Sequence, residues 1–182
     1  MKRITNVKVI TTTDDMPDLS FLGEFSRKPL YRHKNEAWIP TDPDNMRHTI
    51  WFSPCNHLPH KEENWRHVSE EDKQKVIKEF GSLRKADIHY AYEDMRRLQA
   101  YENGKWYMEI IALVVTIQVS EDGTHWVTQD LVESIGGIES DSDDEYKNMI
   151  INEMKEEMKS QLRSWGFDDD EIANALNREW AK

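Results

Sequence analysis

The most apolar stretch of the chain covers residues 107–119, and apolar side chains occupy both of its alternating sets of positions. One set comprises Tyr107, Ile111, Leu113, Val115, Ile117 and Val119, and the other comprises Met108, Ile110, Ala112 and Val114. A strand that is apolar on both faces is normally central in its sheet and covered above and below. We therefore expect residues 107–119 to form the central strand of the fold.

A hairpin should follow this strand, because Asp122-Gly123 is a favoured turn dipeptide and residues 125–135 can return antiparallel. The glycine pair Gly136-Gly137 is expected to close the returning strand. Near the start of the chain, alternation over residues 7–12 predicts a further short strand. Residues 21–25 are expected to form an ordered loop, and residues 49–52 a short strand.

Helical spacing of apolar residues predicts helices over residues 69–80, 87–102 and 143–165. Ser69 followed by three acidic residues is a typical helix start, and Gly81 and Gly166 are typical helix stops. The third helix carries a stripe expected to face the core, formed by Tyr146, Met149, Ile150, Met154, Met158, Leu162 and Trp165.

These elements predict an α+β fold in which an antiparallel sheet, centred on residues 107–119 and 125–135, is covered by the three helices. Residues 1–166 would form one domain, with residues 39–85 as a possible insertion. Residues 167–182 would form a C-terminal helical arm that packs on this domain or extends from it.

The net charge of the chain argues against some classes of protein function. The 182-residue chain has a net charge of −11, and residues 139–182 hold thirteen acids against six bases. Such acidity argues against a protein that coats nucleic acid, whereas it suits docking onto a basic surface or simple solubility. A single cysteine and the lack of a long apolar run predict a cytoplasmic protein without a membrane span.

The junction between the returning strand and the third helix is rich in carboxylates, and three interpretations of it stand. It can be an over-charged helix cap, a site for a divalent cation or part of a partner-binding surface. The run that begins at Asp141 lacks the glycine and glutamate spacing of an EF-hand loop. Candidate partner-binding residues in the junction and the helix are Glu139, Asp141, Asp143, Asp144, Glu145, Glu153, Glu156 and Glu157.

Two short basic pairs are candidate nucleic-acid contacts, with a solvated face as the alternative reading. They are Arg27 with Lys28 and Arg96 with Arg97.

A histidine and cysteine cluster over residues 48–67 raises the question of a metal. It contains His48, Cys55, His57, His60 and His67. Its spacing matches no standard zinc site, so we expect a loop and no bound metal. The chain also lacks a phosphate-binding glycine loop, a nucleophile elbow and an HExxH motif, so we expect neither an enzyme nor a cofactor.

Three blocks of sequence resemble, in order, a widespread family of phage and mobile-element proteins of uncharacterised function. The blocks are residues 16–26 (MPDLSFLGEFS), 95–107 (MRRLQAYENGKWY) and 134–146 (SIGGIESDSDDEY). Length and context are also similar to those of type II-A anti-CRISPR proteins. That resemblance implies a non-enzymatic inhibitor that binds Cas9, with or without guide RNA, in the bacterial cytoplasm. The alternative is a phage accessory protein that binds double-stranded DNA without contacting Cas9.

Overall fold

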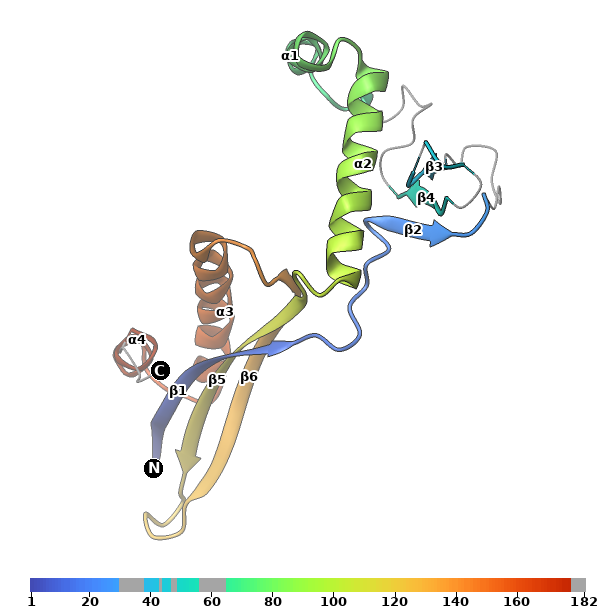
Figure 1. The fold of residues 1–182 in the computed structure, drawn as a ribbon. Coiled ribbons are helices and arrows are strands. Elements are labelled where there is room, and N and C mark those ends of the chain that lie inside the picture. Colours follow the sequence, from blue (N-terminus) through green and yellow to red (C-terminus); the bar gives the residue numbers. More distant parts are fainter. Residues whose placement is uncertain (30–37, 43, 47–48, 56–64, 178–182) are drawn as a thin grey trace. The chain divides into compact units, whose positions relative to one another are not determined.

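The computed structural model of the chain describes residues 1–29, 38–42, 44–46, 49–55 and 65–177. The chain forms two compact units (Figure 1). The first unit comprises Met1–Pro17 and Trp106–Lys182, and the second comprises Asp18–Lys105. The fold is α+β with antiparallel sheets, as the sequence predicted.

The first unit is built on a three-stranded sheet of β1 (Lys2–Thr13), β5 (Met108–Val119) and β6 (Val127–Glu139). Its order is β1-β5-β6 and both pairings are antiparallel, so β5 is central, as expected. β1 is much longer than the predicted strand over residues 7–12. Lys2 pairs with Val119 and Thr13 with Glu109. Pairing with β5 therefore extends the strand over polar residues whose own sequence does not predict one.

The prediction that Gly136-Gly137 closes the returning strand is wrong, because β6 continues to Glu139. Glu109 pairs with Ile138 and Ile111 with Ile135, so the two glycines stand opposite a single residue, Ile110. This is a β-bulge, and its second glycine has a φ of 74° that few other residues adopt. Gly136 and Gly137 therefore form a bulge within β6 and do not end the strand.

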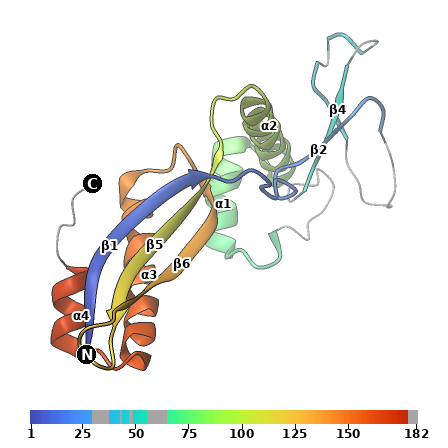
Figure 2. The ribbon, with the colours of Figure 1, turned by 90° about the horizontal axis from the view of Figure 1, so that it is seen from below.

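Two helices, α3 (Asp144–Ser164) and α4 (Asp169–Leu176), pack on one face of this sheet (Figure 2). Their buried side chains join those of the strands in one apolar core. It contains Val7, Ile111, Leu113, Val115, Ile117, Leu131, Ile138, Ile150, Met154, Met158, Leu162, Phe167, Ile172, Ala175 and Leu176. The predicted stripe on α3 is therefore only partly correct, because Tyr146, Met149 and Trp165 are exposed.

The other face of the sheet carries only part of the second apolar layer that we expected. Met108 and Val114 are buried there, whereas Ile110 and Ala112 are half-buried. Polar pairs cross between the strands of this face: the Thr116 hydroxyl donates to the Asp130 carboxylate, and the Gln118 amide donates to Thr128. The guanidinium of Arg3 lies 4.3 Å from the ring centre of Trp126. Polar contacts thus take the place of apolar packing around Thr116 and Gln118 on this face.

The second unit combines a small sheet with a helical hairpin. The sheet has the order β2-β4-β3, from Gly23–Ser26, Trp51–Pro54 and Ile39–Pro40. The predicted loop over residues 21–25 is thus partly a strand. Helix α1 (Glu70–Phe80) begins after the Ser69 cap and ends at Gly81, as predicted. Helix α2 (Leu83–Glu102) starts four residues earlier than expected, because Ser82 caps it through Lys85 N–H.

The helices that fill the core of the first sheet differ from the predicted set. α3 and α4 supply that core, whereas α1 and α2 belong to the second unit and pack on each other. The C-terminal segment packs on the first unit's core, to which Phe167, just before α4, and Ile172 and Leu176 of α4 belong. Residues 18–105, which contain the suspected insertion over 39–85, connect the hydrogen-bonded neighbours β1 and β5. Within the part of the chain that the structure describes, none of the helices combines the length and apolarity needed to cross a membrane.

Candidate partner-binding surface

The acidic junction before α3 is first of all a structural entrance to that helix. The ammonium of Lys147 donates to the buried Glu109 carboxylate at 2.8 Å and to the Ser140 carbonyl at 2.9 Å. Ser140 also exchanges two hydrogen bonds with the backbone of Tyr107, at 2.8 and 3.0 Å. These contacts tie the start of α3 to the start of β5, so the junction has a fixed geometry.

Three of the predicted partner-binding residues already have interactions within the protein. The Asp143 carboxylate caps α3 by accepting the Tyr146 N–H at 2.7 Å. Glu139 lies half-buried at the end of β6, and both Glu139 and Asp141 have interaction partners of their own. Asp144 and Glu145 occupy the exposed first turn, where the helix dipole favours negative charge. The helix-cap interpretation therefore accounts for Asp143, Asp144 and Glu145.

The structure brings the remaining candidates together along the solvent side of α3. A shallow depression there is lined by six residues that we call the α3 outer face: Glu145, Asn148, Met149, Asn152, Glu153 and Glu156. Their spacing of three or four residues places them on one side of the helix, opposite the buried Ile150, Met154 and Met158. Glu157 is exposed beside them but does not line the depression.

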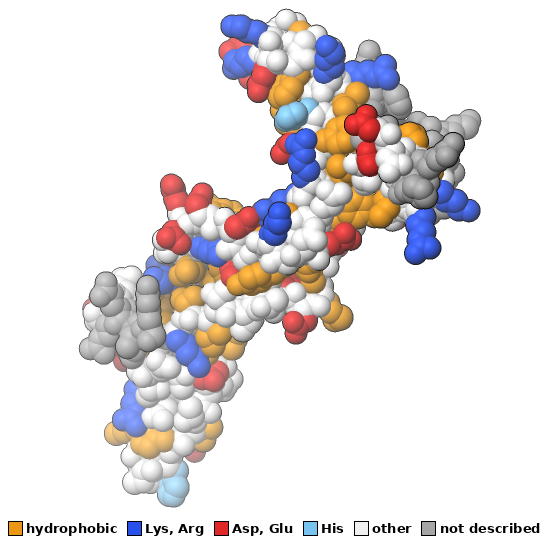
Figure 3. All heavy atoms as spheres, viewed as in Figure 1, with side chains coloured by type: hydrophobic (Ala, Val, Ile, Leu, Met, Phe, Trp, Pro, Cys, Tyr) orange, Lys and Arg blue, Asp and Glu red, His pale blue; other side chains and the backbone are white. Residues whose placement is uncertain are grey.

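The α3 outer face combines carboxylates with exposed apolar side chains. Met149 is 49% exposed at its centre, and Tyr146 is 44% exposed one turn before. Glu156 forms an ion pair with Lys159 at 2.7 Å, and its side chain remains 70% exposed. Among the described residues, the ion pairs of α3 do not involve Glu145 or Glu153. Figure 3 shows acidic side chains gathered over the start of this helix. Carboxylates around an apolar centre suit a basic protein surface.

The basic candidates lie in the second unit and are less available. Arg96 is paired with Glu93 one helical turn before it on α2. Arg97 is half-buried and also has an interaction partner. Arg27 and Lys28, just after β2, are exposed. Of the two pairs, Arg27 and Lys28 are the one whose side chains have no ion-pair partner among the described residues.

The histidine and cysteine cluster lies partly outside the described residues, since His48, His57 and His60 belong to segments that are not described. Cys55 and His67 are both exposed. Over the described ranges, no three potential metal ligands come together.

Sequence reasoning missed a second concave site, a hollow of about 540 Å³ at the tip of the β5–β6 hairpin. Its lining residues are Val119, Ser120, Glu121, Asp122, His125, Val127, Gln129 and Trp165. The turn residues were recognised as a turn, and Trp165 as a core residue. The packing of α3 along the sheet brings the two together, and no local pattern signals that contact.

The chain matches no protein-family model, no curated protein and no solved structure.

Proposed function

We propose that this protein is a non-enzymatic inhibitor that binds Cas9 through the α3 outer face and so prevents Cas9 from engaging or cleaving target DNA. The observation that carries the proposal is the exposed, apolar-centred set of carboxylates on a helix that is anchored to the first unit's core. The proposal takes the choice of Cas9 from the resemblance to type II-A anti-CRISPR proteins. It places the protein in the bacterial cytoplasm.

The charge of this surface suits that partner. Cas9 holds its guide–target heteroduplex in a positively charged channel and reads the adjacent motif with arginines. A rigid helix that presents Glu145, Glu153 and Glu156 can pair with such cations, and Met149 can supply contact area at the centre. Association would then be fast at low salt and slower as salt screens the charges.

Binding is tested by mixing the purified chain with the Cas9–guide complex on a sizing column at low salt, where the two should co-elute. Target-DNA cleavage should fall as the chain is titrated in. Separate elution at low salt would rule out the proposal.

A charge-reversal pair tests the surface itself. Glu145→Lys with Glu153→Lys should weaken binding about tenfold, because attraction becomes repulsion at two rim positions. The matched control is Asp170→Lys with Asp15→Lys, two exposed acids of the same unit. Asp170 holds the same second position in α4 that Glu145 holds in α3, so the helix-dipole cost is matched. Equal loss in the control would assign binding to overall charge and contradict a role for the α3 outer face.

The rival function is that of an accessory protein which binds double-stranded DNA without Cas9. Its support from the described residues is limited to the exposed Arg27 and Lys28, since Arg96 and Arg97 have partners. A gel shift of plain duplex DNA that is lost in Arg27→Ala with Lys28→Ala, and unchanged by Cas9, would favour it over the inhibitor.

A further inference from the structure

The hairpin-tip hollow has apolar walls that are open to solvent. Val127 is 70% exposed and Trp165 is 39% exposed, and Val119 completes this side of the hollow. Trp165 is the C-terminal cap residue of α3, and its backbone N–H donates to the Gln161 carbonyl at 3.2 Å. The helix end therefore fixes the backbone that carries the indole. An exposed tryptophan at the edge of a hollow is a ready contact surface for a flat or apolar group.

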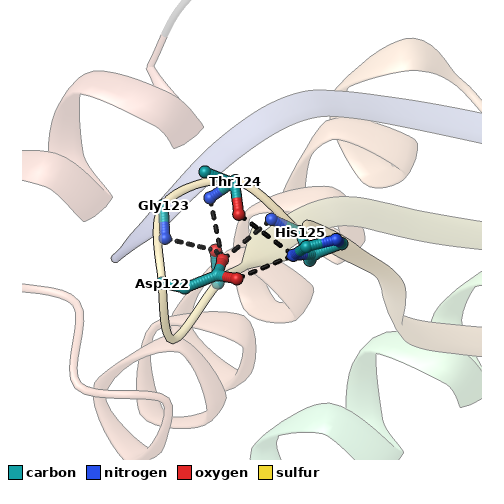
Figure 4. A network of polar contacts seen from close by, with 5 residues as sticks. Asp122, Gly123, Thr124 and His125 are labelled. Carbon is teal, nitrogen blue, oxygen red and sulfur yellow. Dashed lines mark hydrogen bonds and ion pairs between the residues drawn. The ribbon is translucent and has the colours of Figure 1, made fainter.

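The same hollow carries negative charge. Glu121 and Asp122 line it, and the C-terminal end of α3 adds the negative pole of the helix dipole. Asp122 accepts the N–H groups of Thr124 and His125 at 2.8 and 2.9 Å and contacts the His125 ring at 2.7 Å (Figure 4). These hydrogen bonds hold the pKa of Asp122 well below its usual range, so its carboxylate stays ionised.

We infer that this hollow receives an arginine side chain from a partner protein. A guanidinium stacks on an indole face and at the same time donates to a carboxylate, which here is the exposed Glu121. An ammonium group lacks the planar face for the first contact, and an anion would meet two carboxylates and the helix end. Among the described residues, three positive groups lie in or beside the hollow. The His125 ring, when protonated, already faces Asp122, and the N-terminal ammonium donates to the Ser120 carbonyl. Lys2 pairs with Val119, and its ammonium lies over the Phe167 ring, which leaves Glu121 as the carboxylate for the arginine.

This inference does not rest on the Cas9 proposal, because the hollow shares no lining residue with the α3 outer face. Any partner that presents an exposed arginine can use it. The two sites can therefore fail or succeed separately.

The test uses the whole chain labelled with 5-fluorotryptophan, with the Trp165 fluorine resonance assigned from a Trp165→Leu variant. N-acetyl-arginine amide should shift this resonance saturably at low salt. N-acetyl-citrulline amide, which has the same shape without the charge, should shift it far less. Glu121→Gln should weaken arginine binding about threefold, as expected for one exposed ion pair.

The control is Glu157→Gln, which removes one charge from α3 outside the hollow and should leave arginine binding unchanged. An unmoved Trp165 resonance, an equal response to citrulline, or an equal loss in the control would each overturn the inference. Glu121 is exposed and its substitution is conservative, so the outcome does not depend on a variant that fails to fold.

Discussion

The two units of the chain reach their folded form in different ways. In the first, long strands and two helices share one continuous apolar core, and residues such as Leu113, Met158 and Leu162 have no exposed surface. In the second, the strands have two to four residues, and α1 buries no residue completely. This unit also buries apolar side chains, among them Phe52, Met95 and Leu98. Specific contacts add to them: the Trp65 indole donates to the buried Asp87 at 2.9 Å, and Phe80 packs on His89 and Tyr90.

Both candidate surfaces lie in the first unit. A binding surface needs side chains on a rigid backbone, and packing against a continuous core provides that rigidity. The α3 outer face has the packed residues Ile150, Met154 and Met158 directly behind it. A helix without such packing behind it presents its charges less precisely.

A matched pair of leucine truncations tests the comparison with the largest expected effect. Leu162→Ala should cost about 3–5 kcal/mol, because Leu162 is fully buried in the continuous core. Leu98→Ala in α2 should cost less, about 2–3 kcal/mol, since Leu98 is 7% exposed and lies outside the continuous core. Urea unfolding gives the free energies, and hydrogen exchange should show the greater loss of protection in the unit that carries each change. If either variant lost hydrogen-exchange protection equally in both units, the two units would unfold as one cooperative structure.

The ion pair at the entrance of α3 is the next test. Lys147→Met should cost about 1–3 kcal/mol, because it leaves the Glu109 carboxylate buried without its cation. Adding Glu109→Met should restore much of the loss, since the buried charge is then gone. Thermal unfolding of the two variants measures both effects. A double variant that is no more stable than the single one would show that the pair acts by packing alone.

A pair of glycines compares the same local change in the two units. Gly137, in the β6 bulge, and Gly104, after α2, have φ values of 74° and 66°, and neither has an atom within 4 Å of an added Cβ. Each change to alanine should therefore cost about 1 kcal/mol through backbone strain alone. Urea midpoints check this. A larger loss of stability for Gly137→Ala would mean that the bulge also fixes the pairing register of β5 and β6.

Acid provides the smallest test. The pKa of Asp122 is lowered in the folded protein by its bonds to His125 and Thr124. The stabilisation is therefore fully present above the ordinary value of 3.8 and is lost as the pH falls through the lower folded value. Asp122→Asn should flatten the dependence of Tm on pH below about 4. Glu121→Gln, which leaves these bonds in place, should keep the wild-type dependence.

The sequence by itself determined the elements whose signals are local. Alternating apolar residues defined the central strand, Ser69 and Gly81 marked the ends of α1, and Asp122-Gly123 marked the hairpin. The acids of the candidate surface could also be listed in advance. Which of them are free could not, since Asp143 and Glu145 look alike until one caps the helix and the other faces solvent.

Only the tertiary structure decided the rest, because it depends on residues far apart in the chain. β1 extends to Lys2 and Thr13 because β5 pairs with those polar ends, and Gly136-Gly137 form a bulge because β6 has further partners beyond them. Periodicity shows that a helix has an apolar face but not which sheet that face meets. The structure therefore assigned α3 and α4 to the first core, left Tyr146, Met149 and Trp165 exposed, and set Trp165 beside a turn forty residues earlier in the chain.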